Sequence, residues 1–228
     1  MVDSPGEVGF ERLLAYSRQE KSGRLEGRMN DWRFRDTVEK TSVCLAAGEQ
    51  KSIIVVAGHQ LVSEEGLEVL AVGTRDLIES DRPANSLVRK VAQAGGLPIV
   101  PWGVGKWLGE RRDIVKRLIC DPALPQFFLG DSANRPSFWP RPSLFELAKE
   151  AGIRNLPGSD PLPVSGEEKY PGSFGVAMNG SLDTRRPVRD LKERLSDRTI
   201  GICCFGRRKP IFRFARSQIL TRYRRLVE

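Results

Sequence analysis

This 228-residue chain contains a single histidine, His59, and this scarcity excludes more chemistry than any other feature of its composition. One imidazole cannot supply a multi-histidine metal cluster. The four cysteines also show no Cys-x-x-Cys spacing, which is typical of thiols in a reducing cytoplasm rather than of a zinc site. No apolar run approaches the roughly 18 residues of a membrane span, and no signal peptide is readable at the amino terminus. We therefore expect a cytoplasmic protein without a transmembrane segment.

The positive charge is concentrated near the carboxyl end. Residues 206–228 hold eight basic residues and one acid, so that this segment carries +7 of the net +8. Apolar residues recur there at helical spacing and predict an amphipathic helix: Phe212, Ala215, Ile219, Tyr223 and Leu226. Such a helix either binds nucleic acid phosphates or an anionic membrane surface, or it packs by its apolar stripe as the last helix of the domain.

Between these ends, short apolar runs alternate with helical patterns. We expect strands near residues 53–57, 67–72, 97–100, 126–129, 153–156 and 199–204. We expect helices near residues 10–16, 33–47, 83–94, 106–119, 143–151 and 188–195, with a long loop over 157–186. This order favours a parallel sheet, either wound into a (β/α) barrel or open and doubly wound.

Four of the apolar runs end in compact polar loops that carry the chemically suggestive residues. They are the segments IIVVAGHQ (53–60), LPIVPWGVGKW (97–107), FFLGDSANRP (127–136) and NLPGSDPLP (155–163). Because ligands bind at the carboxyl ends of strands in α/β folds, we expect these loops to converge on one pocket.

Two of these loops suggest anion binding and carboxylate chemistry. Lys106, Arg111 and Arg112 fall at or just beyond a helix start, where backbone amides favour a phosphate; alternatively, the neighbouring glycines shape a turn and the basic side chains are solvated. Asp131 follows a strand directly and is placed to hold a divalent cation or act as a general base; alternatively, it caps a turn or pairs with Arg135.

The remaining two loops hold one candidate each. Asp160 lies in a Gly-Ser-Asp turn followed by two prolines, which make the loop rigid and place its carboxylate. His59 ends the most apolar run, where an imidazole binds a metal or shuttles protons, or else is a partly buried structural side chain.

In this order, the loops resemble the polymerase-and-histidinol-phosphatase (PHP) superfamily of metal-dependent phosphoesterases. The resemblance covers roughly residues 53–163 through the segments VVAGHQLVSEEGLEVLAVGT, AQAGGLPIVPW and LPGSDPLP. It implies a distorted (β/α)₇ barrel with its pocket at the carboxyl ends of the strands. That barrel either has a diverged first strand or lacks it, because residues 1–52 contain none of the family's histidines.

The resemblance also implies a depleted metal site. Gln60 and Trp102 stand where the family has a glutamate and a histidine, and Pro161–Leu162 stands in place of the last histidine, so that only Asp160 matches a ligand position. An amide, an indole and a proline do not replace anionic and imidazole donors.

We therefore expect a PHP-like phosphoesterase homologue with weak or lost hydrolysis. Its expected parts are a polar segment (1–32), a barrel domain (33–205) and a basic helix (206–228). The acids would be Asp131 and Asp160, holding at most one Mg²⁺ or Mn²⁺ ion, with His59 as a further candidate ligand. A small phosphorylated ligand would be bound by Lys106, Arg111, Arg135 and Ser159. The alternative is a non-enzymatic module that binds nucleic acid or another anionic partner through its basic helix.

Overall fold

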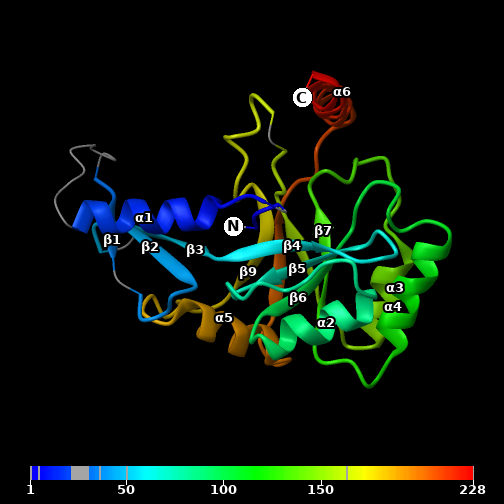
Figure 1. The fold of residues 1–228 in the computed structure, drawn as a ribbon, viewed down its shortest axis with the longest axis horizontal. Coiled ribbons are helices and arrows are strands. Elements are labelled where there is room, and N and C mark those ends of the chain that lie inside the picture. Colours follow the sequence, from blue (N-terminus) through cyan, green and yellow to red (C-terminus); the bar gives the residue numbers. More distant parts are fainter. Residues whose placement is uncertain are drawn as a thin grey trace. The chain divides into compact units, whose positions relative to one another are not determined.

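The computed structural model describes residues 2–4, 6–21, 31–35, 37–49, 51–162 and 164–227 (Figure 1). Over these residues the helices are α1 (Gly9–Lys21), α2 (Ala84–Gln93), α3 (Glu110–Cys120), α4 (Ser143–Glu150), α5 (Pro187–Ser196) and α6 (Ile211–Val227). The strands are β1 (Arg33–Arg35), β2 (Ser42–Ala47), β3 (Lys51–Val56), β4 (Gly58–Val62), β5 (Glu68–Val72), β6 (Leu97–Pro101), β7 (Phe128–Ser132), β8 (Asn155–Gly158), β9 (Phe174–Met178) and β10 (Ile202–Gly206). None of the described helices has both the length and the apolarity needed to cross a membrane.

The described strands form three open sheets, so the predicted (β/α)₇ barrel is wrong. The strand orders are β1-β2-β3, β4-β5-β6-β7-β8 and β10-β9. The first sheet is antiparallel throughout. The pairs β4–β5 and β9–β10 are also antiparallel. Parallel pairing joins β6 to β7 and β7 to β8. A barrel needs a closed ring of parallel strands, whereas residues 42–72 form antiparallel neighbours instead.

The segment 33–47 was predicted to be a helix and is instead the first antiparallel pair, β1 with β2. Nearly every residue of β2 is buried, because β2 is the central strand of its sheet and pairs with β1 on one side and β3 on the other. Gly48, expected to end a helix, has φ +65° in the turn that joins β2 to β3. A glycine with positive φ serves a helix end and a tight hairpin equally well, which explains the error.

The chain divides into two compact units, which interleave along the sequence. The first comprises Met1–Glu64, Glu68–Pro98 and Gly180–Ile200, and the second comprises Glu65–Leu67, Ile99–Asn179 and Gly201–Glu228. In the first unit, Phe10 of α1 packs with Val43, Leu45 and Ala57. The amides of Val188 and Arg189, at the start of α5, donate hydrogen bonds of 2.7 and 2.9 Å to the Glu39 carboxylate.

The second unit contains the strand–helix alternation that the sequence predicted. Along the chain, β6 is followed by α3, β7, α4 and β8, and β6, β7 and β8 lie parallel. The helices bury one apolar side, through Val115 and Leu118 of α3 and Phe145 and Ala148 of α4. The predicted long loop 157–186 contains a strand, β9, which pairs with β10.

Candidate functional site

Three loops of the second unit follow the carboxyl ends of neighbouring parallel strands, as the sequence predicted for them. The register of β7 and β8 sets Asp131 opposite Pro157 and Ser132 opposite Gly158. The Trp102 amide, just after β6, donates a 2.7 Å hydrogen bond to the Gly130 carbonyl of β7. Residues near 102, 131 and 160 therefore gather at one edge of the parallel strands.

Asp131 is committed to an internal ion pair. Its Oδ1 and Oδ2 accept hydrogen bonds of 2.7 and 2.6 Å from Nε and Nη2 of Arg135, and both side chains are buried. Oδ1 also accepts a 2.9 Å bond from the Ser132 amide. Two parallel charge-assisted bonds are the strongest arrangement of these two groups. Asp131 was expected either to hold a cation or act as a base, or to cap a turn or pair with Arg135. The structure shows the pairing with Arg135.

Asp160 holds its own loop in place. Its Oδ2 accepts hydrogen bonds from Ser132 Oγ at 2.8 Å and from Asn134 Nδ2 at 3.0 Å. Asn134 Nδ2 also donates to the Asp160 carbonyl at 2.5 Å. Asp160 has φ +43°, a left-handed conformation that is uncommon outside glycine and here is fixed by these bonds. The carboxylate thus ties the loop after β8 to the loop after β7.

These residues do not fit the divalent cation that the family resemblance implies. The carboxylates of Asp131 and Asp160 already accept bonds from Arg135, Ser132 and Asn134. Within the described ranges, no group of three or more His, Cys, Asp or Glu side chains is arranged to hold a metal ion. His59 lies in β4 of the first unit, where burial lowers its pKa against the opposing influence of Asp3 and Asp76.

The residues predicted to bind phosphate have other contacts. The Lys106 side chain lies over Gly103, so closely that a Cβ there would meet Lys106 Cδ at 2.7 Å. Arg111 Nη2 donates to the Gly105 carbonyl at 3.0 Å, and Arg135 is held by Asp131. Ser159 Oγ accepts a 3.1 Å bond from the Gly172 amide.

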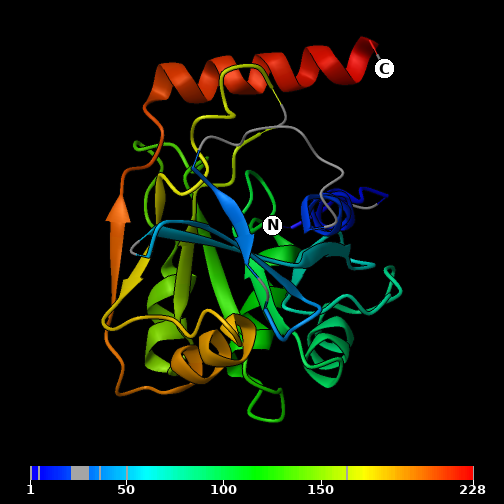
Figure 2. The same cartoon turned by 90° about the vertical axis from the view of Figure 1, so that its left-hand side faces the viewer.

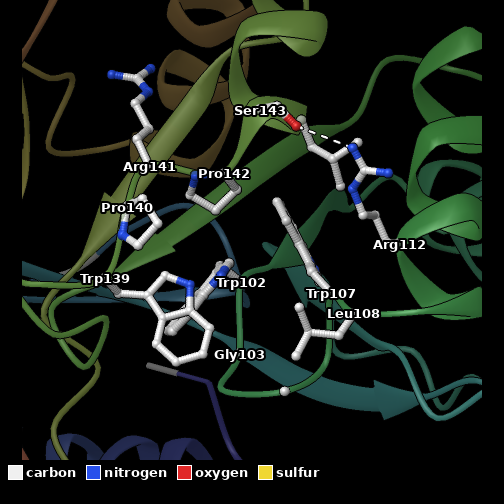
Figure 3. A pocket seen from close by; sticks show the side chains of 12 residues that line it. Trp102, Gly103, Trp107, Leu108, Arg112, Trp139, Pro140, Arg141, Pro142 and Ser143 are labelled. Carbon is white, nitrogen blue, oxygen red and sulfur yellow. Dashed lines mark hydrogen bonds between the residues drawn. The ribbon is translucent and has the colours of Figure 1, made fainter.

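A tryptophan-lined pocket opens beside these loops, on the side of α3 and α4 (Figure 3). Its volume is about 330 Å³. Trp102 and Trp139 meet edge to face with centroids 5.9 Å apart, and Trp107 packs on Phe145 at 5.3 Å. Figure 3 shows the rings of Trp102, Trp107 and Trp139 grouped around the hollow. This wall is apolar, aromatic and composed of large rigid side chains, which suits a flat ligand.

The opposite wall is basic. Arg112 of α3 donates from Nη2 to Ser143 Oγ at 3.3 Å, and Arg141 lies on the other side of Pro142 (Figure 3). Arg141 also pairs with Glu146 at 3.1 Å, but both side chains are more than half exposed, so that pair is weak. The helix α4 begins here after Pro142, with no side-chain cap, so its amide end adds positive potential.

Two buried or half-buried arginines fix the aromatic wall. The Trp139 carbonyl accepts bonds from Arg135 Nη1 at 3.2 Å and from Arg208 Nη1 at 3.3 Å. Arg208 also donates to the Pro136 carbonyl at 3.3 Å. The Asp131–Arg135 pair therefore acts on the pocket indirectly, by positioning the segment that carries Trp139.

Sequence reasoning missed Trp139, Arg141 and Ser143 as lining residues. The signal that could have found them is the run SFWPRPS (137–143), in which an indole and a guanidinium alternate with stiffening prolines just before a helix start. From sequence, Trp102 was considered only as the residue in place of a family histidine, and Trp107 only as part of the segment LPIVPWGVGKW.

No protein-family model, curated protein or solved structure matches this chain. The resemblance to the PHP superfamily therefore stays a prediction, and the functional argument rests on the geometry of the pocket.

Proposed function

We propose that this protein binds a small phosphorylated ligand with a planar ring, such as a nucleoside monophosphate, and hydrolyses it weakly or not at all. The observation that carries the proposal is the pairing, in one pocket of about 330 Å³, of three tryptophans with two arginines. The volume lies at the lower end of the range for small-molecule sites.

Each half of the ligand has a counterpart in the pocket. Stacking of a base on an aromatic side chain contributes about 1–3 kcal/mol, which the partly exposed Trp139 can supply, while Trp102, only 5% exposed, supports it from behind. A phosphate near Ser143 would accept charge-assisted hydrogen bonds from Arg112, and the start of α4 adds its dipole. The exposed Arg141 side chain, whose guanidinium Figure 3 shows on the far side of Pro142, would have to turn toward the phosphate to add its own. The predicted resemblance to a phosphoesterase family supports the choice of a phosphate group.

Weak or absent hydrolysis is expected because the carboxylates of Asp131 and Asp160 are already hydrogen-bonded within the protein. General-base or metal-assisted attack requires a carboxylate that is available to water or a cation. Asp131 would first have to leave Arg135, and Asp160 would have to leave Ser132 and Asn134. A cytoplasmic location remains part of the proposal, supported by four cysteines that are all free thiols.

Intrinsic fluorescence offers a direct test, because three of the chain's four tryptophans line the pocket. Titration with adenosine monophosphate should quench the emission, whereas adenosine or inorganic phosphate alone should bind about tenfold more weakly or worse. Arg112→Gln and Arg141→Gln should each lower the affinity for the monophosphate about tenfold. Arg117→Gln, an exposed change on the same helix as Arg112 but outside the pocket, is the matched control.

Two outcomes would contradict the proposal. Equal affinities for adenosine and its monophosphate would show that the pocket does not bind the phosphate group. Robust release of phosphate in the presence of Mg²⁺ or Mn²⁺, abolished by Asp160→Ala in a variant with an unchanged circular dichroism spectrum, would remove the claim of weak hydrolysis.

A further inference from the structure

Exposed apolar side chains lie along one face of the part of α6 whose side chains the structure describes. Phe212 is 74% exposed and Ile219 is 67% exposed, and Ala215 between them is exposed as well. These positions are three and four residues apart, so they lie on one face of the helix. The prediction that the stripe packs against the domain fails for these three residues. The side chains of Tyr223 and Leu226 lie outside the described part of the structure.

The opposite face is anchored by buried polar contacts. Ser217, only 3% exposed, donates a 3.0 Å hydrogen bond to Glu167 Oε1, and Lys209 just before the helix pairs with Oε2 of the same carboxylate. The Arg213 guanidinium lies 4.2 Å from the ring centroid of Tyr170. Figure 2 shows α6 running past the tip of the loop that contains these partners. This arrangement fixes which face of α6 points outward.

The charge of α6 selects among the possible partners. The helix contains five arginines and no acid, namely Arg213, Arg216, Arg222, Arg224 and Arg225. A second copy of the chain would oppose this charge with an equal one of the same sign. Nucleic acid would satisfy the arginines but leave Phe212 and Ile219 in water. A surface that combines anionic groups with an apolar interior accommodates both kinds of side chain.

We propose that α6 docks on an anionic phospholipid bilayer, with Phe212 and Ile219 inserted among the acyl chains and the exposed Arg216 at the headgroups. Each basic residue near such a surface adds electrostatic attraction, and the inserted side chains add apolar burial. The helix lies on the surface and does not span it. This inference is independent of the ligand proposed for the pocket.

Vesicle sedimentation with the full chain tests the proposal. The wild-type chain should bind vesicles of phosphatidylcholine and phosphatidylserine, should bind phosphatidylcholine alone poorly, and should lose affinity as salt is added. Phe212→Ser with Ile219→Ser should weaken binding about tenfold or more. Arg216→Gln should weaken it roughly fivefold. Leu77→Ser, which changes a fully exposed apolar residue of the first unit, is the control and should bind as wild type does.

Three results would overturn the proposal. The first is no binding of the wild-type chain to phosphatidylserine vesicles, and the second is equal binding by the Phe212→Ser, Ile219→Ser variant. The third is a partner of another class: tight binding of a DNA duplex that this variant retains, or a dimer in sedimentation velocity that it abolishes. Titration of the same variants with adenosine monophosphate keeps a failure here distinct from a failure of the pocket proposal.

Discussion

Two aspartates of the second unit look like catalytic residues in the sequence, but in the structure their carboxylates hold loops in place. Asp131 and Asp160 have the position of reactive carboxylates at strand ends, yet each holds a neighbouring loop. Both acids could be placed at the same edge of the sheet from sequence, because the ends of the strands can be predicted from the apolar runs. It could not assign their partners, because Ser132 and Asn134 reach Asp160 across 28 and 26 residues of chain.

The buried pair of Asp131 and Arg135 makes the first prediction. Asp131→Ala should lower the free energy of unfolding by about 3–5 kcal/mol, because it leaves the Arg135 guanidinium buried without a counter-charge. Urea denaturation followed by circular dichroism measures this. The exposed pair Arg189–Glu193 has the same spacing of four residues, and Arg189→Gln should leave stability nearly unchanged. A fully stable Asp131→Ala chain would mean that the pair is not structural.

Glu167 gives stability a specific dependence on pH. Burial raises the pKa of Glu167, but the bonds from Lys209 and Ser217 outweigh burial, and the pKa lies below its ordinary value of 4.5. A carboxyl group with a lowered pKa in the folded state stabilises the fold fully above its unfolded value. That contribution is lost as the pH falls through the folded pKa.

Comparison with Glu167→Gln isolates this effect. The variant should be less stable than the wild type at neutral pH, because Lys209 is then buried without its partner. The difference should shrink as the pH drops below about 4.5, measured as the free energy of unfolding in urea at a series of pH values. A difference that is independent of pH would show that the carboxylate charge is not what Lys209 requires.

At the scale of elements, helices with clear end signals and strands made of short apolar runs were predictable, whereas β9 was not. Gly95–Gly96 follow α2 and a proline begins α5, and the predicted helices 83–94 and 188–195 are confirmed within one residue at each end. The strand β9 was missed because the residues that make it a strand belong to β10, more than twenty positions later. The pocket suffers from the same limit, since Trp139 gains its role only beside Trp102.

Capping of α5 by Glu39 is a nonlocal contact that can be tested at this scale. Glu39→Ala should destabilise the chain by about 1 kcal/mol, because the first amides of the helix lose their acceptor and the helix dipole loses a favourable negative charge. Thermal unfolding measures the change, with the exposed Glu49→Ala as the matched control. Equal melting temperatures for the two variants would show that Glu39 does not stabilise α5.

At the scale of the whole molecule, the pocket and α6 both belong to the second unit, and the first unit contributes no residue to either. A ligand that binds only the folded state stabilises it by RT ln(1 + [L]/Kd), about 2.7 kcal/mol at a hundredfold excess over Kd. The ligand stabilises the unit that contacts it against local unfolding. It does not stabilise the other unit in this way, because local unfolding there need not release the ligand.

Hydrogen exchange with adenosine monophosphate therefore makes the last prediction. Amides of residues 102–109 and 139–144 should exchange more slowly in the presence of the ligand, while the hairpin of β2 and β3 in the first unit should exchange at its unliganded rate. At a ligand concentration near the Kd of the wild type, Arg141→Gln should show much less slowing, because its affinity is about tenfold lower. Slowing confined to β2 and β3 would place the ligand in the first unit, and the tryptophan pocket would then have no part in binding.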